Sequence, residues 1–408
     1  MEVNLLKFIH AADLHLDSPF LGLKTAPASI WKLIYSSSER ATINLIDRAI
    51  SEQVDFILLV GDLFDRETQN IQAQLFLRNQ LERLDEVDIP VFISWGNHDY
   101  SSESRPEIDW PSNVTVFDSQ VSSHKIQLKS GEQVAISGFS YRTRWLNEDL
   151  ISNFVPDKNA EFNIAMLHGG EKTGEIRNNH YAPFTVGELT AAGFDYWALG
   201  HIHQFQKLAS SVPIYYSGTI QGRNHNEDGT KGALLVNLTH TETKVNFIET
   251  DVITWQKISI SVDEKSSIAE ILELMADKIK ENISDKLALI SVEIENQVGN
   301  TEETAIQNGT LLERLQDMFS RQTSYWPYEI KEVIQPNERV FSEVDNKFWQ
   351  ASEAQLFTDD VITETAGTLF SNAFIANHFH DQKVQSELKQ AVLRNIKQKA
   401  GHKGGQSE

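Results

Sequence analysis

The stretch "VFISWGNHDY", residues 91–100, joins a short, mostly apolar run to three polar side chains, Asn97, His98 and Asp99. Runs of this kind, rich in Val, Ile and Phe, are typical of buried strands. A buried polar group without a partner costs a few kcal/mol. The three side chains therefore either form an ordinary turn or surround something that they bind, and the rest of the chain has to decide between these alternatives.

Four other apolar runs in the first half of the chain also end in polar, ligand-type residues. The runs are "LLKFIHAA" (5–12) before Asp13 and His15, "DFILLV" (55–60) before Asp62, "FNIAML" (162–167) before His168, and "YWAL" (196–199) before His201 and His203. Helical patterns at 38–53 and 71–87 separate the first strands, which predicts an α/β fold with a largely parallel sheet. Functional groups in such sheets lie past the carboxyl ends of the strands. We therefore expect all five polar clusters at one edge of one sheet.

The polar clusters together make a mixed nitrogen and oxygen ligand set: Asp13, His15, Asp62, Asn97, His168, His201 and His203. Each of these residues taken alone has an ordinary interpretation as a turn, a helix cap or a core histidine. As a set without thiolate they suit Mn²⁺, Fe²⁺ or Zn²⁺. Seven ligands are too many for one ion and suit two, and Asp62, in the middle of the set, is the natural bridge.

Composition limits the class of protein. A chain of 408 residues is expected to form two or three domains, and 40% hydrophobic with 23% charged residues is ordinary for a globular protein. The absence of cysteine excludes disulfides and thiolate metal sites and fits a reducing cytosol. No apolar run reaches transmembrane length, so we expect a cytoplasmic protein without a membrane partner. The net charge of −22 counts against a surface built for nonspecific nucleic-acid binding.

The second half of the chain contains none of the ligand clusters. Alternating strand and helix patterns predict a small α+β domain over 255–345, and the patterns over 346–400 are helical. Residues 401–408 are expected to be a disordered tail. The basic segment 382–400 aligns Val384, Leu388, Val392 and Ile396 on one helical face. This stripe predicts a helix that binds a partner, and the alternative is a terminal helix packed on its own domain.

Five short motifs carry a resemblance to a known family. The motifs are "DLH" (13–15), "GDLFD" (61–65), "GNHD" (96–99), "LHGG" (167–170) and "GHIH" (200–203). In this order they resemble the five-block pattern of the calcineurin-like metallophosphoesterases. The stretches "WPSNVTVF" (110–117), "ISGFSYR" (136–142) and "YYSGTIQGRN" (215–224) are similar to the SbcD-type DNA-repair exonucleases, in particular the shorter bacterial YhaO-like branch. The resemblance covers residues 6 to about 250, and 255–335 is similar to the family's capping domain only in its order of strands and helices.

The resemblance implies a β-sandwich of mostly parallel βαβ strands flanked by helices. It implies a metallophosphoesterase domain over 1–254, a capping domain over 255–345 and a helical segment over 346–400. One metal ion would be held by Asp13, His15, Asp62 and His203, and the second by Asp62, Asn97, His168 and His201. His98 would face the scissile phosphate and stabilise the transition state or protonate the leaving oxygen, and Asp99 would orient His98, with a plain helix cap as the alternative.

Other positions have weaker support. Arg142, Arg144 and Arg223 lie in loops near the sheet edge and are candidate phosphate contacts, although solvated arginines are the ordinary alternative. Thr219 stands where the family usually has Ser, and Asp65 stands where some relatives have His, which puts a DNA-positioning role at residue 65 in doubt. No glycine-rich nucleotide-binding loop is found, so the chain itself is not expected to hydrolyse ATP.

Three functions remain open from the sequence. The first is a two-metal DNA nuclease, with Mn²⁺ the favoured ion, acting with a coiled-coil (SMC-like) ATPase partner that the resemblance implies; a homodimer is a further assembly that it allows. The second is a phosphodiesterase or phosphatase for a small nucleotide-like substrate. The third is an inactive scaffold, which the intact ligand set and His98 argue against. The second domain and the helical segment argue against the small substrate.

Overall fold

The protein is described from a computed structural model. It describes residues 5–333 apart from 21–22, 24–25, 66–69, 101–107, 130, 173–180, 210, 264, 282–284 and 297, and beyond 358 it describes 359–367, 370, 379 and 384–385. Residues 1–334 form one compact unit and 335–408 a second. Among the described residues, no helix is long and apolar enough to cross a membrane.

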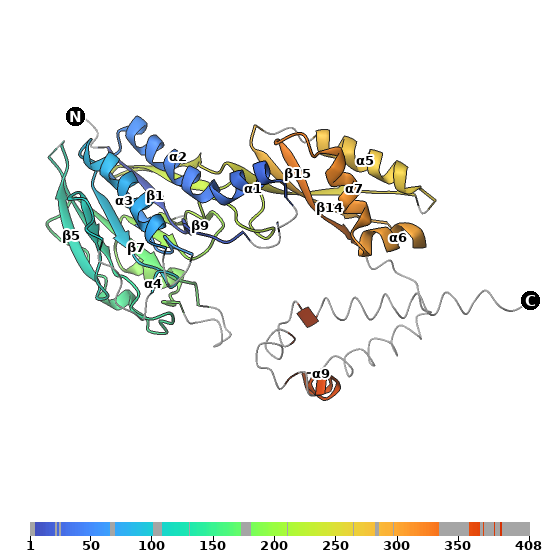
Figure 1. The fold of residues 1–408 in the computed structure, drawn as a ribbon. Helices are drawn as coiled ribbons and strands as arrows, with labels where there is room; N and C mark the ends of the chain where they lie inside the picture. Colours follow the sequence, from blue (N-terminus) through green and yellow to red (C-terminus); the bar gives the residue numbers. More distant parts are fainter. Residues whose placement is uncertain are drawn as a thin grey trace, which may run out of the picture. The chain divides into compact units, whose positions relative to one another are not determined.

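Two six-stranded sheets build the first part of the larger unit (Figure 1). The first sheet has the order β12 (Thr243–Glu249), β11 (Gly232–Leu238), β1 (Leu6–Ala11), β2 (Phe56–Val60), β3 (Val91–Ser94), β4 (Val114–Val116). The second has the order β5 (Ser122–Gln127), β6 (Gln133–Gly138), β7 (Phe162–His168), β8 (Tyr196–Gly200), β10 (Ile214–Tyr216), β9 (Gln206–Ala209). Strands β1 to β4 pair in parallel, as do β6, β7, β8 and β10, while the outer pairs are antiparallel. The mostly parallel α/β architecture is therefore confirmed.

Alternate side chains of each central strand enter different cores. Ile57 and Leu59 of β2 pack under helices α2 (Ser37–Glu52) and α3 (Ile71–Asp85), whereas Phe56 and Leu58 pack between the two sheets. The second sheet is covered on both faces in the same way. Ile164 of β7 enters the core between the sheets, and the side chains on the opposite face of β7 pack against α4 (Val186–Ala191). Both faces of these strands are covered, which explains why they read as continuous apolar runs.

One expectation about the sheets was wrong. The five apolar runs do not belong to a single sheet, because β1, β2 and β3 lie in the first sheet and β7 and β8 in the second. The two sheets stack so that the carboxyl ends of both sets of strands meet at the same edge. An apolar run shows that a strand is buried but carries no mark of which sheet it joins, so the sequence pattern could not separate the two.

A third, three-stranded parallel sheet follows, in the order β13 (Ile253–Ile260), β14 (Leu287–Ile294), β15 (Tyr325–Glu332). Its helices are α5 (Ile268–Glu281), α6 (Asn300–Gln307) and α7 (Thr310–Met318). These elements share a core of their own. Trp255 and Trp326 belong instead to a cluster with Ile30 and Ile34 of α1 (Ala28–Tyr35). A small unit of alternating strands and helices with a parallel sheet therefore follows the sandwich.

Several expectations fall outside the described residues. These are the boundary at 345, the tail at 401–408 and the stripe residues Leu388, Val392 and Ile396. Within the segment predicted to be helical, the structure describes α9 (Asp359–Ala366).

Candidate active site

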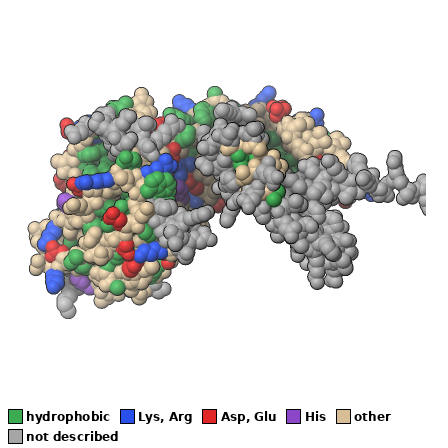
Figure 2. Space-filling view, turned by 90° about the horizontal axis from the view of Figure 1, so that it is seen from below, with side chains coloured by type: hydrophobic (Ala, Val, Ile, Leu, Met, Phe, Trp, Pro, Cys, Tyr) green, Lys and Arg blue, Asp and Glu red, His purple; other side chains and the backbone are tan. Residues whose placement is uncertain are grey.

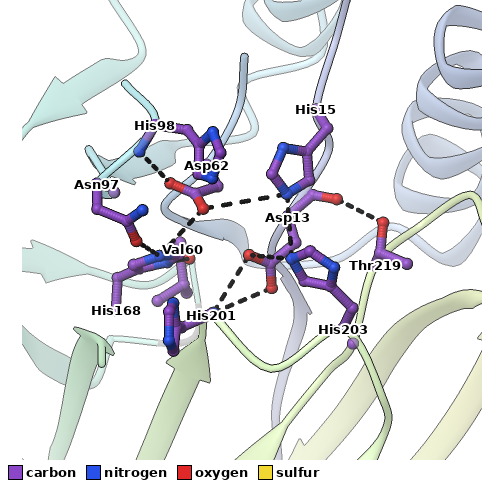
Figure 3. A network of polar contacts seen from close by, with 12 residues as sticks. Asp13, His15, Val60, Asp62, Asn97, His98, His168, His201, His203 and Thr219 are labelled. Carbon is purple, nitrogen blue, oxygen red and sulfur yellow. Dashed lines mark hydrogen bonds and ion pairs between the residues drawn. The ribbon is translucent and has the colours of Figure 1, made fainter. Parts of the chain in front are cut away.

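The predicted ligand side chains lie close together at the edge where the two sheets meet (Figure 3). Asp13 and His15 follow β1, Asp62 follows β2, Asn97 follows β3, His168 is the last residue of β7, and His201 and His203 follow β8. Asp13, His15, Asp62, Asn97 and His168 are buried, and His201 and His203 are partly exposed. Residues that are far apart in the sequence thus form one polar cluster because the parallel strands all end there.

The backbone of the ligand loops is strained. Asp13 (φ 54°), His15 (φ 45°), Asp62 (φ 51°) and His201 (φ 98°) all adopt positive φ values, which non-glycine residues rarely do. Such conformations cost about 1–3 kcal/mol each and are found mainly at functional sites, where the surrounding structure imposes them. The strain turns successive side chains after each strand toward the same cluster.

Two glycines allow the loops to approach closely. A Cβ atom on Gly96 would lie 2.2 Å from Asp62 Oδ1, and one on Gly200 would lie 2.0 Å from the carbonyl oxygen of Val60. Neither separation is tolerable, and the second involves rigid backbone. The glycines in "GNHD" and "GHIH" are therefore needed for the ligand loops to meet.

The ligand atoms fall into two overlapping groups. Asp13, His15 and His203 offer atoms within 4.8 Å of one another, and so do Asp13, Asp62 and His168. Asp62 Oδ2 lies 4.0 Å from His15 Nε2 and 3.4 Å from His168 Nε2, between the two sides. The amide oxygen of Asn97 lies 3.1 Å from His168 Nε2. These separations leave Asp62 in the position of a bridge.

Hydrogen bonds at the far ring nitrogens aim the histidines into the cluster. His168 Nδ1 donates to the carbonyl of Val60 at 3.0 Å, and His203 Nδ1 donates to Glu227 Oε1 at 2.8 Å. Each arrangement leaves the Nε2 lone pair free for a metal ion, as in carboxylate–histidine–metal units. His203 Nε2 faces His15 Nε2 at 3.2 Å. The His203 Nε2, the nearby His15 ring and the Asp13 carboxylate make a nitrogen and oxygen set that fits a divalent metal.

Electrostatics also favour a cation here. Burial raises the pKa of Asp13, and burial lowers the pKa of His15. Burial lowers the pKa of His168 as well, but the neighbouring Asp62 carboxylate outweighs it and raises the pKa to about 9. The field that would hold a proton on His168 is the field that attracts a metal ion.

Comparisons with known proteins agree with this geometry. The family model for calcineurin-like phosphoesterases matches residues 6–205. A relative named "Uncharacterized metallophosphoesterase YhaO", from Bacillus subtilis, is 37% identical over 351 residues, which cover 84% of this chain and 85% of the relative. The chain belongs to the calcineurin-like phosphoesterase family. It is therefore a metal-dependent phosphoesterase, and the resemblance seen in its five motifs is confirmed.

More distant metallophosphoesterase relatives carry names from DNA metabolism. A "DNA double-strand break repair protein Mre11" from Sulfolobus acidocaldarius is 26% identical over 311 residues, covering 72% of this chain and 76% of the relative. A subunit of the nuclease SbcCD from Staphylococcus epidermidis is 24% identical over 244 residues, covering 53% of this chain and 61% of the relative. The similarity to the nuclease branch extends beyond the five motifs.

His98 of the metallophosphoesterase site lies beside the ligands. Its backbone N–H donates to Asp62 Oδ1 at 2.9 Å, and its ring centroid lies 5.3 Å from that of His15. Its Nδ1 donates to the carbonyl of Asp65 at 3.1 Å, which orients the ring and leaves Nε2 for another partner. Figure 2 shows histidine side chains among basic and acidic ones near the middle of the face in view.

Asp99 makes contacts with the backbone that the sequence pattern did not predict. Its carboxylate accepts hydrogen bonds from the backbone N–H groups of Leu63, Phe64 and Gly96, at 2.9 to 3.1 Å. Burial, together with the nearby Asp62 carboxylate, raises its pKa to about 6. The hydrogen-bond partner of His98 Nδ1 is the backbone carbonyl of Asp65. Asp99 thus ties the loop after β2 to the loop after β3, and its part in orienting His98 stays a prediction.

Removing the Asp99 carboxylate should destabilise the protein. We expect Asp99→Ala to lower the free energy of unfolding by at least about 3 kcal/mol, because each buried donor left unsatisfied costs about 1–3 kcal/mol. Denaturant unfolding of chelator-treated protein measures this without a contribution from bound metal. Asp109→Ala, at an exposed position, is the matched control. A loss below about 1 kcal/mol would show that the three hydrogen bonds do not hold the loops together.

Arg223 makes ion pairs that the sequence pattern did not predict. Its side chain is only 11% exposed, and its guanidinium forms ion pairs with Asp65 Oδ1 at 2.6 Å and Glu227 Oε1 at 2.9 Å. Glu227 in turn accepts from His203, and Asp65 Oδ1 lies 3.5 Å from His15 Nδ1. The guanidinium is committed to the two carboxylates that stand behind two ligands. The structure thus places Arg223 behind two candidate ligands, and its contact with phosphate stays a prediction.

The sequence pattern did not reveal Glu227 and Asp65 as supporting residues. Burial raises the pKa of Glu227, but the hydrogen bond from His203 and the charge of Arg223 lower it to about 2, so it stays ionised. A lone Glu in a loop carries no spacing signal, so only the folded arrangement reveals it. The other two arginines are exposed: Arg142 lies 3.3 Å from Asp118, and Arg144 lies over the ring of Trp145. Their contact with phosphate stays a prediction.

Glu227 should strengthen metal binding through His203. We expect Glu227→Gln to weaken the affinity for Mn²⁺ by about 10–100-fold, the range for lost carboxylate support of a histidine ligand. A calorimetric titration with Mn²⁺ measures the affinity directly. Glu295→Gln, at an exposed position directly after β14, is the matched control. Equal affinity in the two variants would mean that Glu227 does not act on the metal ligand.

Proposed function

We propose that this chain is a two-metal phosphodiesterase whose substrate is DNA. The observation that carries the proposal is the pair of ligand groups that share Asp13, together with Asp62, whose Oδ2 lies near His168 of its own group and near His15 of the other. Asp13, His15, Asp62 and His203 would hold one ion, and Asp62, Asn97, His168 and His201 the other. Mn²⁺ is the proposed ion, with Fe²⁺ or Zn²⁺ as alternatives, because the ligands are imidazole and oxygen without thiolate.

The metal ions and the protein would divide the chemistry. Two divalent ions, when bound, neutralise the charge of the phosphodiester and lower the pKa of a water molecule. His98 lies beside the bridging carboxylate with its ring oriented by the carbonyl of Asp65. It would donate a proton to the departing oxygen, which is otherwise a poor leaving group. The backbone contacts of Asp99 and the ion pairs of Arg223 would hold the ligand loops in place while the phosphodiester bond is broken.

DNA is favoured over a small ester by two observations. The relatives named above include a double-strand break repair protein and a nuclease subunit, and a further unit with a three-stranded parallel sheet follows the catalytic sandwich. The net charge of −22 works in the other direction, because it repels DNA at long range. Binding would therefore depend on the metal ions, local basic groups or a basic partner.

The test compares two substrates with Mn²⁺-loaded protein. Rates are measured on linear DNA and on a small chromogenic phosphodiester under the same conditions. Cleavage of DNA far above the rate on the small ester supports the proposal. The reverse order would overturn it in favour of a phosphodiesterase or phosphatase for a small nucleotide. No hydrolysis of either substrate, with both ions bound, would favour a scaffold.

The partner would be a coiled-coil ATPase bound through residues after 346, in a cytoplasmic complex. We expect a chain truncated after Asn346 to keep its thermal midpoint and its rate on the small ester, while losing capture of the ATPase. The physical reason is that 335–408 forms a unit separate from 1–334, where every ligand lies. Thermal unfolding and pull-down measure the two properties. Unfolding on truncation would show that the terminal segment belongs to the core.

A further inference from the structure

A cavity of about 290 Å³ adjoins the metal cluster on the side of His203. Its volume is near the lower end of the range of about 300–1,000 Å³ for small-ligand sites. Thr219 lines it as well, and the Thr219 hydroxyl donates to the carbonyl oxygen of Asp13 at 2.7 Å. The cavity wall is thus continuous with the ligand loops, although the mechanism described above makes no use of the cavity itself.

A buried cation lines this cavity. Lys231 is 8% exposed, and its carbonyl accepts from the backbone N–H groups of Thr250 and Asp251. Within the described part of the chain, its ammonium group has no hydrogen bond or ion pair. Lysine is rarely buried to this extent unless it is paired, and this side chain lines the cavity. This arrangement points to an anionic ligand.

The acidic side chains near Lys231 are already paired with other cations. Glu227 pairs with Arg223 at 2.9 Å, Asp228 with Lys257 at 3.1 Å, and Asp251 with Lys286 at 2.8 Å. They offset part of the burial that lowers the pKa of Lys231. Asp228 also lines the cavity, and its pairing with Lys257 reduces its repulsion of an anion. The ammonium is therefore left for a ligand from outside.

The same cavity has an aromatic wall. Phe205 is 45% exposed and Phe247 38% exposed, and their ring centroids lie 5.8 Å apart. Phe205 is stacked on Tyr215, with the rings 12° from parallel, which holds it in place. Exposed aromatic rings beside a cation are the elements with which proteins bind a nucleobase and its phosphate.

We propose that this cavity receives the nucleotide next to the scissile phosphodiester. Its base would lie against Phe205 and Phe247, and its outer phosphate would pair with the Lys231 ammonium. The inference rests on the proposed function, because it assumes a nucleic-acid substrate. It adds a requirement that a small ester cannot meet, namely a phosphate one nucleotide away from the bond that is cut.

The experiment measures binding rather than cleavage. The probes are thymidine dinucleotides with a slowly hydrolysed phosphorothioate link, carrying a terminal phosphate at the 5′ end, at the 3′ end or at neither. Calorimetric titration into the full Mn²⁺-loaded chain gives each affinity. We expect one terminal phosphate to tighten binding about tenfold, the contribution of one charge-assisted hydrogen bond. Which end it occupies gives the direction of the strand through the site.

Three variants separate the roles of the cavity. Lys231→Met keeps the stem and should abolish the advantage of the terminal phosphate, while Lys231→Arg should retain it. Phe205→Ala should weaken all three probes about tenfold, as for one lost base stack. An advantage that survives in Lys231→Met, or its absence in the original chain, would overturn the inference. If the probes behave as expected but linear DNA is not cut, the nucleotide site stands and the nuclease proposal fails.

Discussion

Replacing Asp62 by Asn is expected to lower kcat/KM on a small phosphodiester by on the order of 10³-fold, since metal ions supply several kcal/mol of transition-state stabilisation. The carboxylate is buried and lies between His15 Nε2 and His168 Nε2, at 4.0 and 3.4 Å. Asparagine keeps the shape and can still accept the N–H of His98. It lacks the negative charge that two neighbouring cations require of a bridge.

Metal analysis distinguishes this explanation from simple unfolding. The original chain should bind two ions after reconstitution, and Asp62→Asn should bind one, with a similar far-ultraviolet spectrum. Asp277→Asn, on the exposed face of α5, is the matched control and should keep both ions and full activity. Two ions and an unchanged rate in Asp62→Asn would contradict the bridging role.

The fold class could be predicted because burial on both faces leaves a simple mark. Strands such as Phe56–Val60 are apolar throughout, and the helical patterns at 38–53 and 71–87 correspond to α2 and α3 within two residues at each end. The family resemblance implies a β-sandwich, but the division of the apolar runs between its two sheets could not be predicted from their sequence. It depends on which strands hydrogen-bond to which, and β1 pairs with β11, more than 200 residues later in the chain.

The clustering of the candidate metal ligands could be predicted for a related reason. They follow directly after buried strands, where a polar side chain such as Asp62 needs a special reason to be present. The residues that support them carry no such mark. Glu227 and Asp65 act through His203, His15 and Arg223, and they become neighbours only after the loops have folded. For the same reason the sequence carries no sign of the ion pairs that Arg223 forms with Asp65 and Glu227.

Asp99 shows how adjacent residues can differ in role. "GNHD" contains Asn97, His98 and Asp99 in succession, and a sequence motif suggests that they act together. In the structure Asn97 lies against His168, while the Asp99 carboxylate turns to the backbone of Leu63 and Phe64. The strained loop after β2, with Asp62 at φ 51°, exposes the N–H groups that Asp99 binds. The three polar residues of the motif therefore make different contacts.

Changing His98 to Ala should lower turnover by about 10²-fold or more while both metal ions remain bound, the low end for loss of general acid catalysis. The ring is not required to hold Asp62, because that contact comes from the backbone N–H of His98, which alanine retains. Metal content should therefore match that of the original chain. Loss of an ion in this variant would make His98 a ligand and overturn its assignment.

The leaving group gives the sharper test of His98. A proton donor matters most when the departing oxygen is a poor leaving group, so the loss should be large for an alkyl ester and small for a p-nitrophenyl ester. His124→Ala, at an exposed position beside Phe117, controls for loss of an imidazole elsewhere. If His98→Ala slows both esters by the same factor, the imidazole acts on the charge of the phosphate itself. A graded loss that follows the basicity of the departing oxygen instead identifies His98 as the proton donor, because only proton transfer depends on that basicity.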